Sequence, residues 1–327
     1  MTSALEPTSA RSFGALWPAE DVRRRRLGRY AGINAAMERP LALQLSRRGF
    51  FSEVNIAIGA TLFALTQGRR LAVSQSGFNG LRWEDYFAST LPVADPALIA
   101  STPPEALIAK PKAEAFRALL AWIAEAAETK VRFRIEALEI EGDLFQAKRA
   151  LFQLFCRPTP EIEAEAAKAM RQLQLRPGRF AAVHLRRGDK VAQRIKNGRP
   201  WSEGEKAPPE QIARLLEALS PSTREVLVLT DDFAAVGELE AACPGRRVVS
   251  LCPPGEAGHD QETFNAAPLG IRTATVRRLV AESVIAAQSD AFAGGFKSNV
   301  AKFIASIHAD PRRCASTDAL AAPWPYH

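Results

Sequence analysis

Two adjacent arginines near the middle of the chain follow an apolar run. Residues 179–185 have the composition of a strand, and they lead directly into Arg186, Arg187, a glycine, Asp189 and Lys190. Arginine carries a planar fork of donors that can hold two phosphate oxygens at once. Because ligands of open α/β sheets bind just beyond the carboxyl ends of the strands, this segment predicts a diphosphate site. The alternative is the start of a solvated loop, with His184 as an ordinary core histidine.

Two later segments carry polar groups in the same position. A second predicted strand is followed by Asp231 and Asp232, and a third, residues 290–295, leads to Ser298 and Asn299 at the start of a helix. A helix N-terminus is a ready site for an anion. Each motif alone is a weak signal, since paired aspartates after a strand are often only a helix cap. In this order, the three motifs together predict a nucleotide diphosphate site.

The elements that position these groups alternate between strand and helix. Strands are predicted at residues 180–185, 225–229, 247–251 and 290–295, with helical segments between them. This order is typical of a parallel sheet with helices on both faces, so we expect an α/β fold.

The length of the chain predicts two domains of ordinary size. Residues 1–40 are expected to form an irregular leader, in which the run Arg23–Arg26 would be a solvated or phosphate-touching arm. Residues 41–175 and 176–327 are expected to form two Rossmann-like domains, separated near an Arg-Pro-Gly break at 176–178.

The three motifs resemble those of a known enzyme superfamily. Residues 184–190, 229–232 and 292–299 are similar to the three ordered motifs of the α1,6- and protein O-fucosyltransferases, which include the rhizobial nodulation fucosyltransferases. Residues 49–65 resemble the opening loop and helix of the family more loosely. The resemblance implies a GT-B-like fold, in which two Rossmann-like domains face a cleft. The first would be the acceptor side, and the second would bind GDP-fucose.

The resemblance also implies roles for individual residues. Arg186 would grip the β-phosphate and stabilise the departing GDP, in an inverting transfer that needs no metal and no cofactor beyond the GDP-fucose donor. His184 and Glu282 would approach the guanine nucleoside, although the family usually has aspartate in the second place. Lys190 is expected to act in catalysis beside Arg186. The further residues expected at the donor are Arg187, Asp189, Asp231, Asp232, Lys297, Ser298, Asn299 and Asn55.

One position departs from the family pattern. In the α1,6 branch, a glutamate just after the first motif can act as the base on the acceptor hydroxyl, and Arg194 stands there in this chain. A base must reach the hydroxyl proton, so the candidates are Glu53 in the first domain and Glu203 and Glu205 in the loop. The sequence does not choose among them. A dissociative transfer needs little help from a base, so activity is still expected.

Composition and charge restrict the classes of ligand and partner that we expect. The charge of +7 suits acidic ligands, but no alternation of aromatic and basic residues accompanies it, so no nucleic-acid partner is expected. The four cysteines have neither paired nor metal-like spacing, which favours a reducing, cytoplasmic location. We find no secretory signal and no apolar stretch long enough to span a bilayer. A peripheral contact with a membrane surface stays open.

The sequence therefore predicts a cytoplasmic fucosyltransferase that acts on a hydroxyl of a glycan or glycolipid. Two alternatives remain. A GT-B enzyme with another nucleotide-sugar donor is one, because a phosphate grip does not identify the sugar. The other is a nucleotide-sugar-binding protein without catalysis, which the missing glutamate permits.

Overall fold

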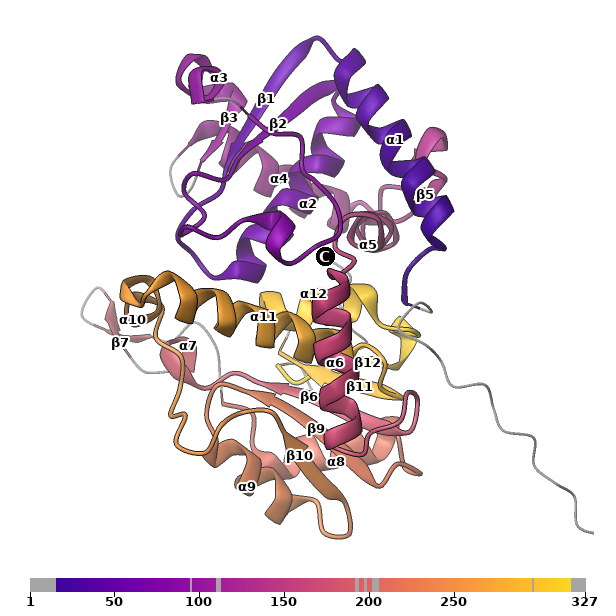
Figure 1. Cartoon of the computed structure of the whole chain (residues 1–327), viewed down its shortest axis with the longest axis vertical. Helices are drawn as coiled ribbons and strands as arrows, with labels where there is room; N and C mark the ends of the chain where they lie inside the picture. The colour runs from indigo at the N-terminus through magenta and orange to yellow at the C-terminus, as the bar shows by residue number, and fades with distance from the viewer. Residues whose placement is uncertain are drawn as a thin grey trace, which may run out of the picture.

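Two parallel sheets form the framework of the molecule. The computed structural model describes residues 16–94, 96–109, 113–191, 194–196, 199–201, 206–295 and 297–318. One sheet is built from the first half of the chain and the other from the second half. In Figure 1 the first sheet lies in the upper part of the view and the second in the lower part, and α11 (Leu269–Ala286) crosses between them. The predicted α/β fold with parallel sheets is confirmed.

The elements of the two halves follow in chain order. The first half contains α1 (Glu20–Ala36), β1 (Arg39–Gln44), α2 (Phe50–Thr66), β2 (Arg69–Ser74), α3 (Pro96–Ser101), β3 (Leu107–Ala109), α4 (Glu114–Glu128), β4 (Phe133–Ile135), β5 (Ile140–Gly142) and α5 (Leu144–Phe155). The second contains α6 (Pro160–Gln172), β6 (Phe180–Leu185), α7 (Gly188–Val191), β7 (Arg194–Lys196), β8 (Arg199–Trp201), α8 (Pro209–Leu219), β9 (Glu225–Thr230), α9 (Ala234–Ala242), β10 (Arg247–Ser250), α10 (Gln261–Ala266), α11, β11 (Ala291–Gly294), α12 (Asn299–Ile307) and β12 (Cys314–Ser316).

The first sheet has the order β2-β1-β3, and both strand pairs are parallel. Helix α2 packs against β2 and buries most of its side chains, because its sequence is apolar on almost every side. Gly68 follows the end of this helix with φ of 57°, a left-handed conformation that glycine adopts without steric cost. Gly68 thus separates the end of α2 from the start of β2.

The second sheet has the order β10-β9-β6-β11-β12, with every neighbouring pair parallel. In chain order this is 3-2-1-4-5, so the direction of winding reverses between β6 and β11. Such a switch point leaves a crevice at the carboxyl ends of the strands, where ligands of doubly wound sheets bind. His184 pairs in register with Leu229 on one side and Gly294 on the other. The residues that follow these three strands therefore emerge side by side.

Alternate residues of the second sheet face two different layers. Ala181, Val183 and Leu185 pack with apolar side chains of α8 and α9 in one cluster. Phe180 and Ala182 face the opposite way, into a core that continues through α11 and α12 to the helices of the first half. Successive strand side chains point to opposite faces, so this fully buried strand serves both layers. The two halves share one continuous apolar core.

The first 40 residues differ from the irregular leader that the sequence predicts. Helix α1 lies within them, and Arg23 in it is only 4% exposed. Its guanidinium pairs with Glu20, and Arg26 pairs with the distant Glu139. The arginine run therefore belongs to a folded helix with ion pairs. Helix α1 has no regular apolar stripe, which is why the sequence pattern did not reveal it.

Packing across residue 176 also differs from a simple two-domain division. Helix α6 lies in the range predicted for the first domain, but it packs against α11 of the second half. In the opposite direction, α12 packs against α2 and α5. Between residues 103 and 175, the short strands β3, β4 and β5 lie among the helices α4, α5 and α6.

Candidate active site

A cavity of about 780 Å³ lies at the carboxyl edge of the second sheet. The segment 48–52 at the start of α2 lines it from the first half. From the second half, the lining comes from the ends of β6, β9 and β11, from the start of α12 and from one side of α11. The cavity thus occupies the switch point between β6 and β11, and residues of all three sequence motifs meet there.

Arg186 is held by two carboxylates at the end of β6. Its Nη2 donates a hydrogen bond of 2.8 Å to Asp189 Oδ1, and its Nε lies 3.2 Å from Asp231 Oδ2. Since the side chain lines the cavity, its remaining N–H groups can serve an anionic ligand.

Asp231 joins three segments at the end of β9. Its Oδ1 accepts a hydrogen bond of 2.7 Å from the Arg187 backbone N–H, and its Oδ2 accepts one of 3.2 Å from the His259 backbone N–H. With the contact to Arg186, this carboxylate fixes both the arginine loop and the loop after β10. Hydrogen bonds to an ionised acceptor are stronger than neutral ones, so these contacts keep the guanidinium in place.

The arginine loop and the loop after β10 touch at two glycines. A Cβ on Gly188 would lie 2.2 Å from the His259 carbonyl oxygen and 2.8 Å from Asp231 Oδ2. A Cβ on Gly258 would lie 2.9 Å from Gly188 Cα, and its φ is 102°. No larger residue fits either position without moving the loops apart. Steric crowding thus explains why glycine stands between the arginines and Asp189.

The charged neighbours of Arg186 in the motif differ in how they lie relative to the cavity. Arg187 is 5% exposed, and its Nη2 donates 2.9 Å to Glu238 Oε2 on α9, although part of the residue lines the cavity. Asp189 accepts from Arg186 and from the Gln261 backbone N–H, so it positions the arginine rather than lining the cavity. Lys190 lies in α7, and the part of the chain that the structure describes does not include its side chain.

The start of α12 forms the opposite wall of the site. Ser298 is the N-cap residue, and its Oγ accepts from the Ala301 backbone N–H at 3.4 Å. Asn299 and Lys297 also line the cavity, and the Lys297 side chain is exposed. Asp318, which follows β12, accepts from the Lys297 backbone N–H at 2.9 Å. A helix N-terminus beside a lysine is favourable for an anion that enters from the Arg186 side.

His184 and Glu282 lie at the buried end of the same cavity, each with 6% of its surface exposed. Burial and the nearby charge of Arg186 lower the pKa of His184 to about 4, so the imidazole is neutral at pH 7. Its Nδ1 is buried and has no partner among the described residues. Burial raises the pKa of Glu282 to about 7, although Arg278, 3.8 Å away, lowers it. This end can therefore meet both donors and acceptors of a ligand.

Besides Asp189, three predicted site residues with described side chains are not among those that line the cavity. Asp232 Oδ1 accepts from the Ala234 backbone N–H at 3.0 Å, which makes it a cap at the start of α9. Glu53 is 1% exposed and accepts from the backbone N–H and the hydroxyl of Ser46. Asn55 donates to the carbonyl oxygens of Phe51 and Asn299, and so ties α2 to α12.

These contacts favour other roles for three of the predicted site residues. A base has to reach the acceptor hydroxyl, so the buried position of Glu53 does not fit the catalytic role predicted for it. Asp232 and Asn55 fit structural roles in place of donor binding. Glu203 and Glu205, the other candidate bases, lie outside the described residues, as does the side chain of Arg194.

Sequence reasoning missed several residues in the loop after β10 and on α11. His259 lines the cavity beside Arg186, and burial and that positive charge lower its pKa. Glu256 and Arg278 also line it, with Arg278 Nη2 at 2.8 and 2.9 Å from the two carboxylate oxygens of Glu256. One signal was available for His259. It follows a predicted strand in the same half, as the other site residues do, although nine residues after the end of β10.

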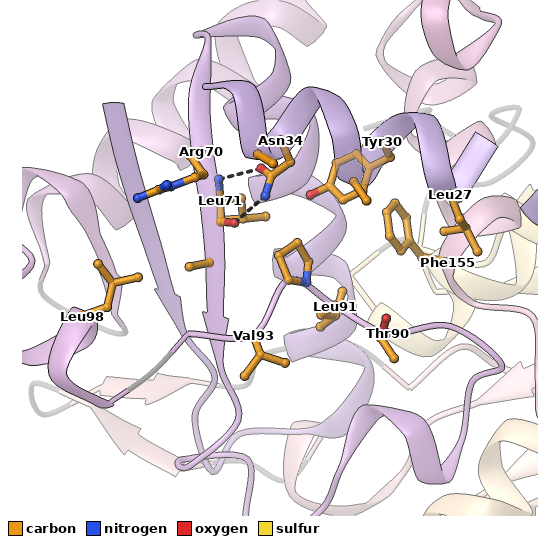
Figure 2. Close-up of a pocket in the computed structure, with 14 residues that line it drawn as sticks. Leu27, Tyr30, Asn34, Arg70, Leu71, Thr90, Leu91, Val93, Leu98 and Phe155 are labelled. Atoms are coloured by element: carbon orange, nitrogen blue, oxygen red, sulfur yellow. Dashed lines mark hydrogen bonds between the residues drawn. The ribbon is translucent and has the colours of Figure 1, made fainter. Parts of the chain in front are cut away.

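A second hollow, of about 440 Å³, lies beside the edge strand β2 (Figure 2). Tyr30, Asn34 and Phe155 are among its lining residues, and none of the predicted site residues is. The Asn34 side chain exchanges two hydrogen bonds with the backbone of Leu71, at 2.8 and 2.9 Å, and so takes the place of a neighbouring strand. Figure 2 thus shows a protected sheet edge. The groups suited to chemistry lie in the larger cavity.

Three further properties concern the cysteines, metal-binding groups and membrane-spanning helices. All four cysteines are buried and free. Within the described ranges, no group of three or more histidines, cysteines or acidic residues is arranged to hold a metal ion. In the same ranges, no helix has the length and apolar character needed to cross a bilayer.

Comparisons with known proteins give similarity at the level of structure. No family model matches the sequence, and no curated protein matches it. A mutant of Arabidopsis thaliana FUT1 in complex with GDP has 10% identity and a TM-score of 0.48, over 91% of this chain and 74% of that one. The fucosyltransferase NodZ from Bradyrhizobium has 14% identity and a TM-score of 0.46, over 82% and 92% of the two chains. POFUT1 in complex with GDP has 13% identity and a TM-score of 0.46, over 85% and 98%. Because all three TM-scores lie below 0.5, we base the function on the cavity of this chain itself.

Proposed function

We propose that this protein is a glycosyltransferase that binds GDP-fucose in the large cavity and transfers the sugar, with inversion and without a metal, to a hydroxyl of a glycan or glycolipid. Lys190, Arg187, Lys297, Ser298 and Asn299 belong to the proposed donor site with Arg186. The three motifs resemble those of the α1,6- and protein O-fucosyltransferases, and their gathering around one cavity supports this proposal.

One observation carries the proposal. The Arg186 guanidinium, held between Asp189 and Asp231, shares its cavity with the Ser298-capped start of α12. This pairing offers two kinds of donor to one diphosphate, namely a fixed guanidinium and the free N–H groups of a helix N-terminus. Lys297 adds a third positive group.

The geometry suits the charge that develops in glycosyl transfer. As the bond from the sugar to the diphosphate breaks, negative charge grows on the departing phosphate, and a cation that is already oriented stabilises it without reorganisation. Arg186 therefore lowers the energy of the transition state more than that of the bound donor. The guanidinium supplies the positive charge that a metal ion would otherwise provide.

The buried end of the cavity suits the nucleoside. A guanine base presents ring and amino N–H donors beside carbonyl and ring-nitrogen acceptors. The Glu282 carboxyl and the neutral His184 imidazole lie where they can meet such groups, and Arg278 supplies donors nearby. In a transition state with strong dissociative character, the acceptor hydroxyl needs little activation. Transfer therefore does not depend on Glu53.

A nucleotide panel tests the proposal directly. We expect GDP and GDP-fucose to raise the melting temperature and to bind in calorimetry, with UDP and UDP-sugars as matched controls that do neither. GDP release from GDP-fucose, followed with and without a panel of glycan and glycolipid acceptors, measures catalysis. Binding without any release would favour a non-catalytic nucleotide-sugar-binding protein. The absence of binding by every GDP-sugar would refute the proposal.

A further inference from the structure

A continuous chain of hydrogen bonds connects the first half of the molecule to Arg186. It begins at Asn79, in the loop between β2 and the 3₁₀ turn Trp83–Asp85, and it passes through α10. The proposed function gives no role to Asn79, to Asn265 or to the side chain of Gln261.

Asn79 makes two contacts across the boundary between the halves. Its Nδ2 donates a hydrogen bond of 2.8 Å to Asn265 Oδ1 on α10. Its Oδ1 accepts a hydrogen bond of 2.7 Å from Arg272 Nη1 on α11. The residue is 6% exposed and has φ of 59°, so the loop holds the amide in a fixed, buried position. An amide that is satisfied at both ends fastens α10 and α11 to the first half.

Helix α10 carries the link onward. Asn265 Oδ1 also accepts 2.9 Å from Gln261 Nε2, which donates in addition to the Arg47 carbonyl oxygen at 3.4 Å. The Gln261 backbone N–H donates 3.4 Å to Asp189 Oδ2. The other oxygen of Asp189 is the one that accepts from Arg186. Asn79 is therefore connected to the guanidinium through Asn265, Gln261 and Asp189.

We propose that Asn79 is a positioning residue for diphosphate binding, because it anchors α10 and thereby fixes the carboxylate that orients Arg186. This inference rests on the proposed function. Asn79 itself does not line the cavity. Its contribution lies in the orientation of the guanidinium, because loss of the anchor would leave Asp189, one of the two carboxylates that hold Arg186, free to adopt other arrangements.

Two substitutions separate this role from general stability. Asn79→Gly removes the amide and keeps the left-handed backbone, since glycine adopts φ near 60° without cost. Asn79→Asp keeps an acceptor for Arg272 and replaces the donor to Asn265 by a carboxylate oxygen. It therefore breaks the direct link to α10 and keeps the indirect one, in which Arg272 also donates to the Asn265 carbonyl oxygen at 3.2 Å. Asn34→Ala is the matched control, because Asn34 is also a buried asparagine of the first half, and it pairs with Leu71 away from the cavity.

The measurements are the Kd of GDP, the kcat and KM for GDP-fucose, and the hydrogen exchange of the Gln261 and Asp189 backbone amides. All are made on the full chain, well below the melting temperature of each variant. We expect Asn79→Gly and Asn79→Asp to raise the Kd roughly tenfold, to lower kcat and to speed exchange at both amides. Asn34→Ala should lower the melting temperature and leave the Kd and the exchange of these amides as in the wild type.

The outcomes distinguish this inference from the proposed function. If the wild-type protein binds GDP and both Asn79 variants bind it equally well, the positioning role is wrong and the proposed function stands. A lower melting temperature of the Asn79 variants with an unchanged Kd and kcat would also show that the positioning role is wrong. If the wild-type protein binds neither GDP nor inorganic pyrophosphate, both proposals fall. If it binds pyrophosphate alone and Asn79→Gly weakens that binding, the positioning role stands and the choice of nucleotide falls.

Discussion

Arg186 and Asp231 face each other across the ends of two neighbouring parallel strands, with Nε and Oδ2 3.2 Å apart. The register of β6 and β9 sets this relationship, because Leu185 pairs with Thr230 and the next residue of each strand reaches the same edge. The same carboxylate also accepts from two backbone N–H groups. The cation of the site is therefore oriented by the framework of the sheet rather than by a flexible loop alone.

Replacement of Arg186 by alanine should abolish measurable turnover and weaken GDP binding. An oriented donor to a developing oxyanion is typically worth about 10²–10³ in kcat, and the guanidinium carries a full charge as well. Arg186→Lys should recover part of the binding but little of the rate, because an ammonium lacks the planar fork. Steady-state kinetics and calorimetry measure both effects.

The matched control for Arg186 is Arg214→Ala. Arg214 is an exposed arginine of α8 that does not line the cavity, so its removal changes the net charge by the same amount. Turnover by Arg186→Ala at the wild-type rate, or an equal loss in Arg214→Ala, would contradict the role given to Arg186.

The adjacent aspartates Asp231 and Asp232 should behave differently. Asp231→Asn weakens three contacts around the arginine loop, so we expect lower GDP affinity together with a lower melting temperature. Asp232→Ala removes one cap bond at the start of α9 and should cost about 1 kcal/mol of stability with no change in affinity. Denaturant unfolding and GDP titration of both variants test the difference. Equal effects on affinity would show that Asp232 also serves the donor.

Local patterns in the sequence were sufficient to predict the strand ends of the site. Arg186, Asp231 and Ser298 each follow an apolar run with the length of a strand, and parallel strands bring their carboxyl ends together. What could not be predicted depends on contacts between distant segments. The burial of Glu53 against Ser46, and the position of His259 beside Arg186, depend on how loops pack against segments that are distant in the sequence.

The fold was predictable to a similar extent and for the same reason. The alternating elements from β6 to α12 follow hydrophobic runs separated by polar or glycine-rich turns, and these are visible locally. Helix α1 was missed because tertiary ion pairs, such as that of Arg26 with Glu139, stabilise a segment without an apolar stripe. The packing of α6 on α11 likewise has no counterpart in local periodicity.

Glu282 should make the stability of the protein depend on pH. Burial raises its pKa to about 7 in the folded state, against 4.5 for the ordinary carboxyl. The folded state then binds more protons than the unfolded state between these values, so this residue lowers stability progressively as pH rises from about 4.5 to 7. The full penalty above pH 7 is on the order of 3 kcal/mol.

Glu282→Gln removes this titration. We expect the variant to gain stability relative to the wild type at pH 8, and to gain least near pH 4, where the glutamate is protonated in both states. Urea unfolding at several pH values measures the difference. A stability difference that does not change between pH 4 and pH 8 would contradict the raised pKa of Glu282.

Two glycines of the second half should respond to alanine in opposite ways. Gly188→Ala would place a Cβ 2.2 Å from the His259 carbonyl oxygen, so the arginine loop and the loop after β10 must separate. We expect a loss of stability of roughly 1–3 kcal/mol, as for other overpacked sites, and a marked loss of GDP affinity because Arg186 moves with its loop.

Gly237 lies inside α9, where a Cβ would meet no atom within 4 Å. Gly237→Ala should therefore raise stability by about 0.5–1 kcal/mol and leave GDP affinity unchanged. Thermal unfolding and GDP titration of the two variants provide the test, and normal GDP binding by Gly188→Ala would mean that the close contact of the two loops does not position the arginine.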